Sequence, residues 1–176
     1  DDLQGIMGRY YAANDGEDPT VASALYEQYL PRFSGDKLPQ EPEGIALALA
    51  DRLDTLVGIF SIGQQPTGSK DPFALRRASL GLLRIIVQLN IDVDLKLAIY
   101  QAAKQLPTVD TKSLNNLCEQ VLTYILDRFK SWYKEQGLQT EIFLSVAALE
   151  LGNPLDIDAR VAAVNKFTLL PEASSL

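Results

Sequence analysis

The sequence predicts an all-α fold, a multi-helix bundle, from three observations. Helix-start signals, in which a capping Asp, Asn or Glu precedes a proline, recur along the chain. They lie at Asp18-Pro19, Glu41-Pro42 (a weaker version), Asp71-Pro72 and Asn153-Pro154. Between them, apolar residues recur at helical spacing. Strand signals are nearly absent, because β-branched residues do not alternate cleanly with polar ones and no Asn-Gly turn occurs.

These signals define the elements in order. A proline fits the first helical turn because the N–H there has no intrahelical partner. Pro31, Gly137 and Gly152 are the stop signals after the second, sixth and seventh helices. The pattern predicts helices at 3–13, 19–30, 43–60, 72–89, 93–105, 112–135, 140–151 and 155–167.

Two of these helices have clear apolar faces. The fourth is expected to bury Phe73, Leu80, Leu83, Ile86 and Val87. The sixth shows a helical stripe of Leu117, Val121, Tyr124, Ile125, Arg128, Phe129 and Trp132. Residues 140–167 are expected to form two short helices separated at Gly152-Asn153-Pro154, and the chain is expected to be monomeric.

Composition excludes several kinds of chemistry. The 176 residues include no histidine, which removes every Ser/His/Asp or Cys/His mechanism and every His-ligated metal centre. The single cysteine, Cys118, is predicted to be a small buried residue of a helix, and no disulfide within the chain can form. No stretch approaches 18 uninterrupted apolar residues, so no membrane-spanning segment is expected.

The net charge of −7 is unevenly distributed. Residues 1–60 carry 4 Lys or Arg against 11 Asp or Glu, and residues 105–176 carry 6 against 9. Only residues 61–104 are net positive, with 6 basic against 3 acidic side chains. An acidic chain is not a general nucleic-acid binder, and no DNA partner is expected. Any phosphate contact should therefore concentrate in the middle segment.

Asp51 and Asp54 lie three residues apart and share a helix face, so together they could hold a divalent cation. The other ligands of such a site would have to be His or further carboxylates, and His is absent. Asp51 follows the apolar run 45–50 and is expected to be buried, with a hydrogen-bonding partner. A structural role for Asp51 is therefore preferred over a metal or catalytic one.

The segment 61–70 is a long Gly/Pro/polar loop between two strong helices, and such loops often carry function. It is not a P-loop, because its lysine follows the serine and no strand precedes it. The loop, Lys70 and the following helix N-terminus could still bind phosphate. The candidate phosphate-binding residues are Lys70, Arg76, Arg77 and Arg84, and the alternative is an ordinary solvated basic face.

Aromatic residues gather at Tyr10-Tyr11, Tyr26, Tyr29 and Trp132-Tyr133. They could stack nucleic-acid bases. Core and interface packing is the commoner use of such residues, and it is the expectation here.

Four ordered segments resemble the β subunit of the bacterial tetrameric glycyl-tRNA synthetase. They are residues 3–12 (LQGIMGRYYA), 29–36 (YLPRF followed by Gly35-Asp36), 48–60 (ALADRLDTLVGIF) and 70–78 (KDPFALRRA), the last being the most specific. From about residue 95 onward, the chain resembles the family only in its helical pattern. The chain is too short for a whole subunit and is expected to be an internal fragment.

The resemblance implies a function and a set of partners. The family ligates glycine to its tRNA in the cytoplasm, using ATP and Mg²⁺, as a heterotetramer of two α and two β subunits. The α subunit holds the activation site, and the β subunit binds tRNA. The resemblance further implies that residues 1–62 are the C-terminal part of a degenerate HD-type helical domain. Residues 63–71 are then a loop, and residues 72–176 continue the bundle.

In active HD phosphohydrolases, the segment that resembles Ala50-Asp51-Arg52-Leu53 supplies a metal-binding aspartate. Asp51 is thus a vestigial HD-type position, and Gln28 stands where a histidine would be expected. We therefore expect neither a catalytic residue nor a metal site in this chain. The preferred interpretation is a tRNA-binding and architectural part of the β subunit. The alternatives are an HD-type phosphohydrolase with Asp51 and Asp54 as ligands, and a purely structural helical scaffold.

Overall fold

The computed structural model describes residues 3–107, 109–110 and 112–171. In this part of the chain every regular element is a helix, which confirms the all-α prediction. The helices are α1 (Ile6–Asn14), α2 (Pro19–Glu27), α3 (Pro42–Ser61), α4 (Leu75–Gln88), α5 (Leu95–Lys104), α6 (Leu114–Leu126), α7 (Arg128–Glu135), α8 (Thr140–Ala147) and α9 (Pro154–Thr168).

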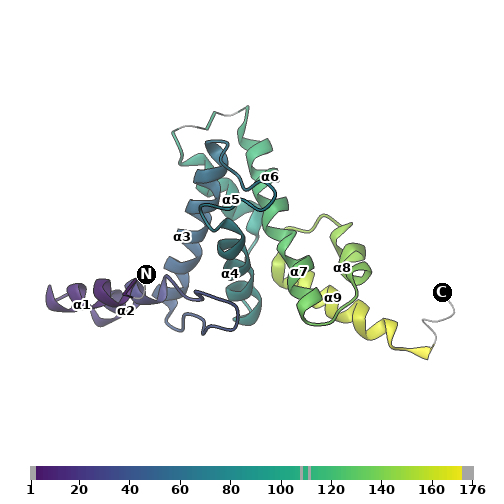
Figure 1. Ribbon diagram of the computed structural model, residues 1–176, viewed down its shortest axis with the longest axis horizontal. Coiled ribbons are helices and arrows are strands. Elements are labelled where there is room, and N and C mark those ends of the chain that lie inside the picture. The colour runs from purple at the N-terminus through teal and green to yellow at the C-terminus, as the bar shows by residue number, and fades with distance from the viewer. Residues whose placement is uncertain (1–2, 108, 111, 172–176) are drawn as a thin grey trace.

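The helices are arranged as an elongated molecule (Figure 1). The pair α1–α2 lies at one end, α3 to α6 form the middle, and α7 to α9 lie at the other end. One apolar core runs through the middle and the C-terminal end, from Leu56 on α3 through Leu83 on α4 and Ile125 on α6 to Val161 on α9. None of the described helices is long and apolar enough to cross a membrane.

Three of the four predicted helix starts are confirmed. Asp18 and Asn153 cap α2 and α9 through their side chains, and Glu41 precedes α3 without a side-chain bond. The predicted start at Asp71-Pro72 is wrong, because α4 begins at Leu75. The backbone of Ala74 adopts a left-handed conformation (φ 55°) there, so the helix cannot extend back to Pro72.

The C-terminal half differs from the prediction in two places. The predicted sixth helix is divided at Asp127, where the Lys130 N–H bonds the Asp127 carbonyl at 3.2 Å in a three-residue turn. The seventh ends at Ala147 rather than residue 151, and Glu150 adopts φ 52°. The two short helices expected over residues 140–167 are confirmed, as α8 and α9.

A hydrogen bond joins the start of α5 to the segment before α9. The Leu95 N–H donates to the Gly152 carbonyl at 3.0 Å. The Asn153 amide beside it donates to the Asp92 carboxylate at 2.6 Å. Segments about 60 positions apart in the sequence are therefore held together where two helices begin.

The packing prediction for the aromatic residues holds in this chain for Trp132 and Tyr133, and in part for Tyr26 and Tyr29, which are half-buried. Trp132 and Tyr133 are buried, and both rings stack on Phe129. Tyr10 and Tyr11 are 68% and 63% exposed, so they do not pack in this chain. Phe73 was expected to be buried but is 43% exposed, because it precedes α4 instead of lying within it.

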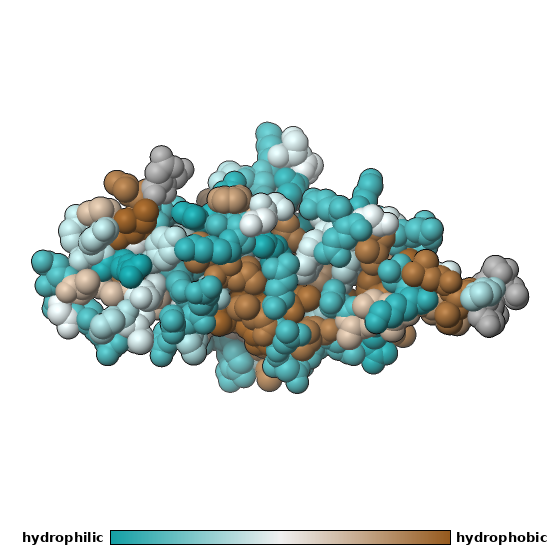
Figure 2. Space-filling view, turned by 90° about the horizontal axis from the view of Figure 1, so that it is seen from below, coloured by the Kyte–Doolittle hydropathy of each residue, from teal (hydrophilic) through white to brown (hydrophobic). Residues whose placement is uncertain are grey.

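Apolar side chains also reach the surface (Figure 2). They gather in the middle of the face shown, beside the N-terminal residues and beside the C-terminal end of α9. The most exposed include Leu3 at the N-terminal end and Leu169 at the C-terminal end.

Candidate functional site

The loop between α3 and α4 is folded onto itself. Thr67 and Lys70 exchange two backbone hydrogen bonds, of 3.2 and 2.9 Å, across a turn in which Gly68 has φ 53°. A positive φ of this kind suits glycine, which has no Cβ. The Lys70 side chain is left exposed at the end of this turn.

The N-terminus of α4 is capped by the Asp71 carboxylate. Its Oδ1 accepts the Leu75 N–H at 2.8 Å and its Oδ2 accepts the Arg76 N–H at 3.0 Å. We expected free N–H groups at this helix start to face a phosphate. Two of them, those of Leu75 and Arg76, are bonded to Asp71, so a phosphate here would rely mainly on side chains.

The structure divides the four basic candidates into two pairs. Arg76 donates to the Gly68 carbonyl and so ties the loop to α4. Arg84 donates to the carbonyls of Phe33 and Asp36, at 3.1 and 2.9 Å. Lys70 and Arg77 are exposed. Within the described part of the chain, their side chains make no hydrogen bond or ion pair.

The carbonyl groups that Arg84 contacts belong to the turn formed by residues 31–37. Asp36 is buried at the centre of this turn. Its carboxylate accepts the Arg32 N–H at 2.9 Å, the Arg32 Nε–H at 3.0 Å and the Lys37 N–H at 3.0 Å. Burial alone would raise the pKa of Asp36, but the bonds from Arg32 and Lys37 outweigh it and hold that pKa below its ordinary value.

Arg52 fastens the same turn to α3 from the other side. Its guanidinium is buried and donates to the carbonyls of Gln28 and Ala48 at 2.9 Å and of Leu30 at 2.8 Å. Burial lowers the pKa of Arg52, while the charge of Asp51 acts in the opposite direction. The buried charge is thus held by carbonyl groups.

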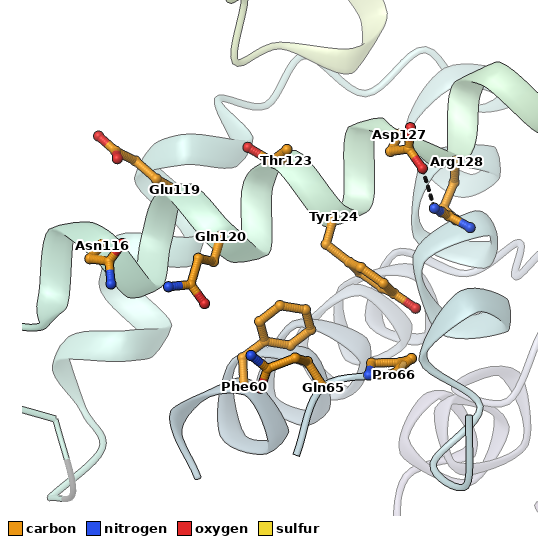
Figure 3. A pocket seen from close by; sticks show the side chains of 10 residues that line it. All are labelled: Phe60, Gln65, Pro66, Asn116, Glu119, Gln120, Thr123, Tyr124, Asp127 and Arg128. Atoms are coloured by element: carbon orange, nitrogen blue, oxygen red, sulfur yellow. Dashed lines mark hydrogen bonds and ion pairs between the residues drawn. The ribbon is translucent and has the colours of Figure 1, made fainter. Parts of the chain in front are cut away.

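A pocket of about 520 Å³ opens between the 62–74 loop and α6 (Figure 3). The Phe60 and Tyr124 rings lie in the space between the two elements, with centroids 5.1 Å apart. The Arg128 guanidinium lies 5.2 Å from the Tyr124 ring centroid and pairs with Asp127. Burial raises the pKa of Tyr124, whose hydroxyl has no hydrogen-bond partner among the residues that the structure describes.

Cys118 behaves as predicted. It is buried on α6, and burial raises the pKa of its thiol, followed by the charge of Glu119. A thiol in that state is a poor nucleophile, so Cys118 is a packing residue.

Comparison with known proteins shows which family these elements belong to. The profile of the glycyl-tRNA synthetase beta subunit matches residues 1–148. The chain belongs to this family. The match continues well past residue 95, so the resemblance extends further along the chain than the sequence analysis suggested.

Individual relatives agree over nearly the whole chain. Proteins named glycine–tRNA ligase beta subunit are 55% identical in Marinobacter nauticus, 51% in Chromohalobacter salexigens and 53% in Pseudomonas entomophila. Each similarity covers 99% of this chain and 25% of the relative. The chain therefore spans about a quarter of the length of the curated relatives it matches.

The family resemblance drew attention to Asp51, and the structure corrects what we expected of it. Asp51 is exposed, and its side chain makes no hydrogen bond or ion pair with the residues that the structure describes, whereas its neighbour Arg52 is buried. Successive residues of a helix point in directions about 100° apart. This explains why the buried position expected for Asp51 is taken by Arg52 instead. Asp54 is exposed as well, and the described residues contain no group of three or more His, Cys, Asp or Glu that could hold a metal ion.

Three further residues of this region were missed by the sequence analysis. Arg52 was named only as part of a family segment. Arg32 and Phe33 were noted only as part of a family segment, although both are exposed on the 31–37 turn beside Arg84. The signal that could have found Arg32 and Phe33 is an aromatic residue placed between two cations, Arg32 and Lys37, within seven residues.

Proposed function

We propose that this chain is part of a glycine–tRNA ligase beta subunit and contributes tRNA binding and subunit architecture. The observation that carries the proposal is the 51–55% identity to proteins of that name over 99% of the chain. The whole enzyme would ligate glycine to its tRNA in the cytoplasm with ATP and Mg²⁺. Its α subunit would complete a heterotetramer of two α and two β subunits. We assign no residue of this chain to ATP or Mg²⁺.

The basic residues Lys70, Arg76, Arg77 and Arg84 are the proposed tRNA-binding set. The competing arrangement is one in which these arginines pair with carboxylates of the acidic first 60 residues. Arg84 does contact that region, but through the carbonyl oxygens of Phe33 and Asp36. A carbonyl carries no net charge, so Arg76 and Arg84 keep their full positive charge while being held in place. Lys70 and Arg77 are exposed beside them and supply the direct phosphate contacts.

The test uses the assembled synthetase, with the full-length beta subunit carrying Lys70→Ala and Arg77→Ala. Each lost phosphate contact should reduce the slope of log affinity for tRNA against log salt by about one. The expected result is weaker tRNA binding with a slope reduced by about two.

A matched control removes two exposed lysines from other helices, Lys104→Ala and Lys130→Ala, and should leave affinity and slope unchanged. If the Lys70/Arg77 variant folds, assembles and binds tRNA like the unmodified enzyme, the proposed tRNA contact is wrong and the basic face is a structural one.

A further inference from the structure

Phe33 is an exposed aromatic residue on a tight turn surrounded by cations. Its side chain is 60% exposed, whereas Phe60, Phe129 and Phe143 are buried. We propose that Phe33 stacks on an unpaired base of an RNA strand, while Arg32 and Lys37 contact the adjoining phosphates. This inference rests on the proposed function and adds Phe33 as the residue that contacts an unpaired base.

The turn that carries Phe33 is held on two sides. Arg84 of α4 donates to the Phe33 carbonyl itself, at 3.1 Å. Arg52 of α3 donates to the Leu30 carbonyl just before the turn, at 2.8 Å. Inside the turn, the buried Asp36 carboxylate binds the backbone and the guanidinium of Arg32. An aromatic ring mounted on so fixed a backbone loses little conformational entropy when a base stacks on it.

The surroundings of the ring favour a nucleotide over an apolar protein surface. The Arg32 guanidinium carbon lies 6.0 Å from the Phe33 ring centroid. Lys37 is exposed on the same turn, with its Nζ 5.3 Å from the Tyr26 ring. The only carboxylate of the turn, that of Asp36, is buried and bonded. The exposed part of the turn therefore offers a π-face and positive charge, the two features that single-stranded nucleic acid requires.

The same face continues along α4 toward the proposed phosphate contacts. Arg84 and Arg77 are seven residues apart, so they project from the same side of the helix, about 10 Å apart along its axis. A strand whose base rests on Phe33 would pass Arg84 and reach Arg77 within a few nucleotides. One RNA strand would thus stack a base on Phe33 and place a phosphate against Arg77.

A photocrosslinking experiment tests the occupant directly. The full-length beta subunit carries Phe33→p-benzoylphenylalanine, is assembled with the α subunit, and is irradiated with glycine tRNA. We expect a crosslink to tRNA at an unpaired nucleotide. The same replacement at Tyr10, which is 68% exposed on α1 at the end of the molecule, is the control and should give none. A crosslink from Phe33 to either protein subunit in place of tRNA would overturn the inference.

Affinity measurements separate this inference from the proposed function. Phe33→Leu should weaken tRNA binding by about 5- to 150-fold, the loss typical of one stacked base, with an unchanged salt slope because no phosphate contact is removed. Phe33→Tyr keeps the ring and should bind like the unmodified enzyme. If Lys70→Ala with Arg77→Ala lowers the salt slope while Phe33→Leu binds normally, the proposed function stands and stacking at Phe33 is wrong. If Phe33→Leu alone weakens binding, stacking stands and the α4 phosphate contacts are wrong.

Discussion

The guanidinium of Arg52 lies directly beneath Gly81, where a Cβ atom would come within 2.9 Å of the Arg52 Nε. The absence of a side chain at Gly81 lets α4 pass close over the buried arginine of α3. This arrangement places Arg84, one turn further along α4, against the 31–37 turn. The contact between Arg52 and Gly81 thus positions the proposed tRNA-binding face.

Gly81→Ala should therefore destabilise the chain. Arg52 cannot easily move away, because its donors are bonded to the carbonyls of Gln28, Leu30 and Ala48. We expect a loss of about 1–3 kcal/mol in the free energy of unfolding, measured by urea denaturation. The matched control is Gly58→Ala on α3, where a Cβ would meet nothing within 4 Å. It should stabilise by about 0.5–1 kcal/mol, because alanine is the better helix former. Equal stability of the two variants would contradict the close contact.

The stability of the chain should depend on the ionisation of Asp36. The pKa of Asp36 is lowered in the folded state, so its contribution is fully present above about pH 4, near the pKa of an unfolded aspartate. It is lost as the pH falls through the lower, folded-state pKa. Asp36→Asn, which cannot offer both oxygens to Arg32 and Lys37, should be less stable than the unmodified chain at pH 7.

The difference between these two proteins should shrink as the pH falls below about 4. The measurement is the free energy of unfolding at several pH values between about 2 and 7. Asp18 and Asp110 also have lowered pKa values, through hydrogen bonds from Thr20 and Ser113, but they contribute equally to both proteins. A difference that is independent of pH would show that the ionised carboxylate of Asp36 is unimportant.

Removal of the α4 cap should cost less than disruption of the core. Asp71→Ala leaves the N–H groups of Leu75 and Arg76 without their acceptors, and we expect a loss of about 1 kcal/mol. Asp51→Ala is the control, because Asp51 is exposed on α3 and its loss should change stability by less than about 0.5 kcal/mol. Thermal unfolding of the two variants checks the difference, and an Asp51 variant that is the less stable of the two would contradict it.

The helices themselves could be predicted because their signals are local. Asp18 accepts the Thr20 N–H and Asn153 accepts the Leu155 N–H, so each cap is contained within three residues. Asp71 shows how such a signal misleads. Asp71 does cap α4, as expected of an acidic residue before a proline. It lies four residues before Leu75, however, because Ala74 adopts a left-handed conformation and delays the start of the helix.

The candidate site was less predictable because its contacts are distant in sequence. Arg52 is bonded to carbonyls 22 and 24 positions earlier, and Arg84 to carbonyls 48 and 51 positions earlier. The spacing of apolar residues along α3 does not show whether Asp51 or Arg52 faces these carbonyl groups. Net charge depends only on composition, so it could single out the middle segment as the candidate for phosphate binding. It could not identify Phe33, whose exposure follows from how α3 and α4 hold its turn.

The hydrogen bond between the Leu95 N–H and the Gly152 carbonyl has a consequence for the order of folding. The Leu97 N–H of the first turn of α5 is bonded locally to the Asp94 side chain, but the Leu95 N–H has an acceptor that is synthesised long after α5 itself. On the ribosome, α5 would emerge before the segment around Gly152 has left the exit tunnel. The Leu95 N–H would lack its native acceptor until then. Contacts that close so long a stretch of chain form late and slow the folding of a helical protein. The middle of the molecule should therefore reach its final form only after the start of α9 has left the exit tunnel.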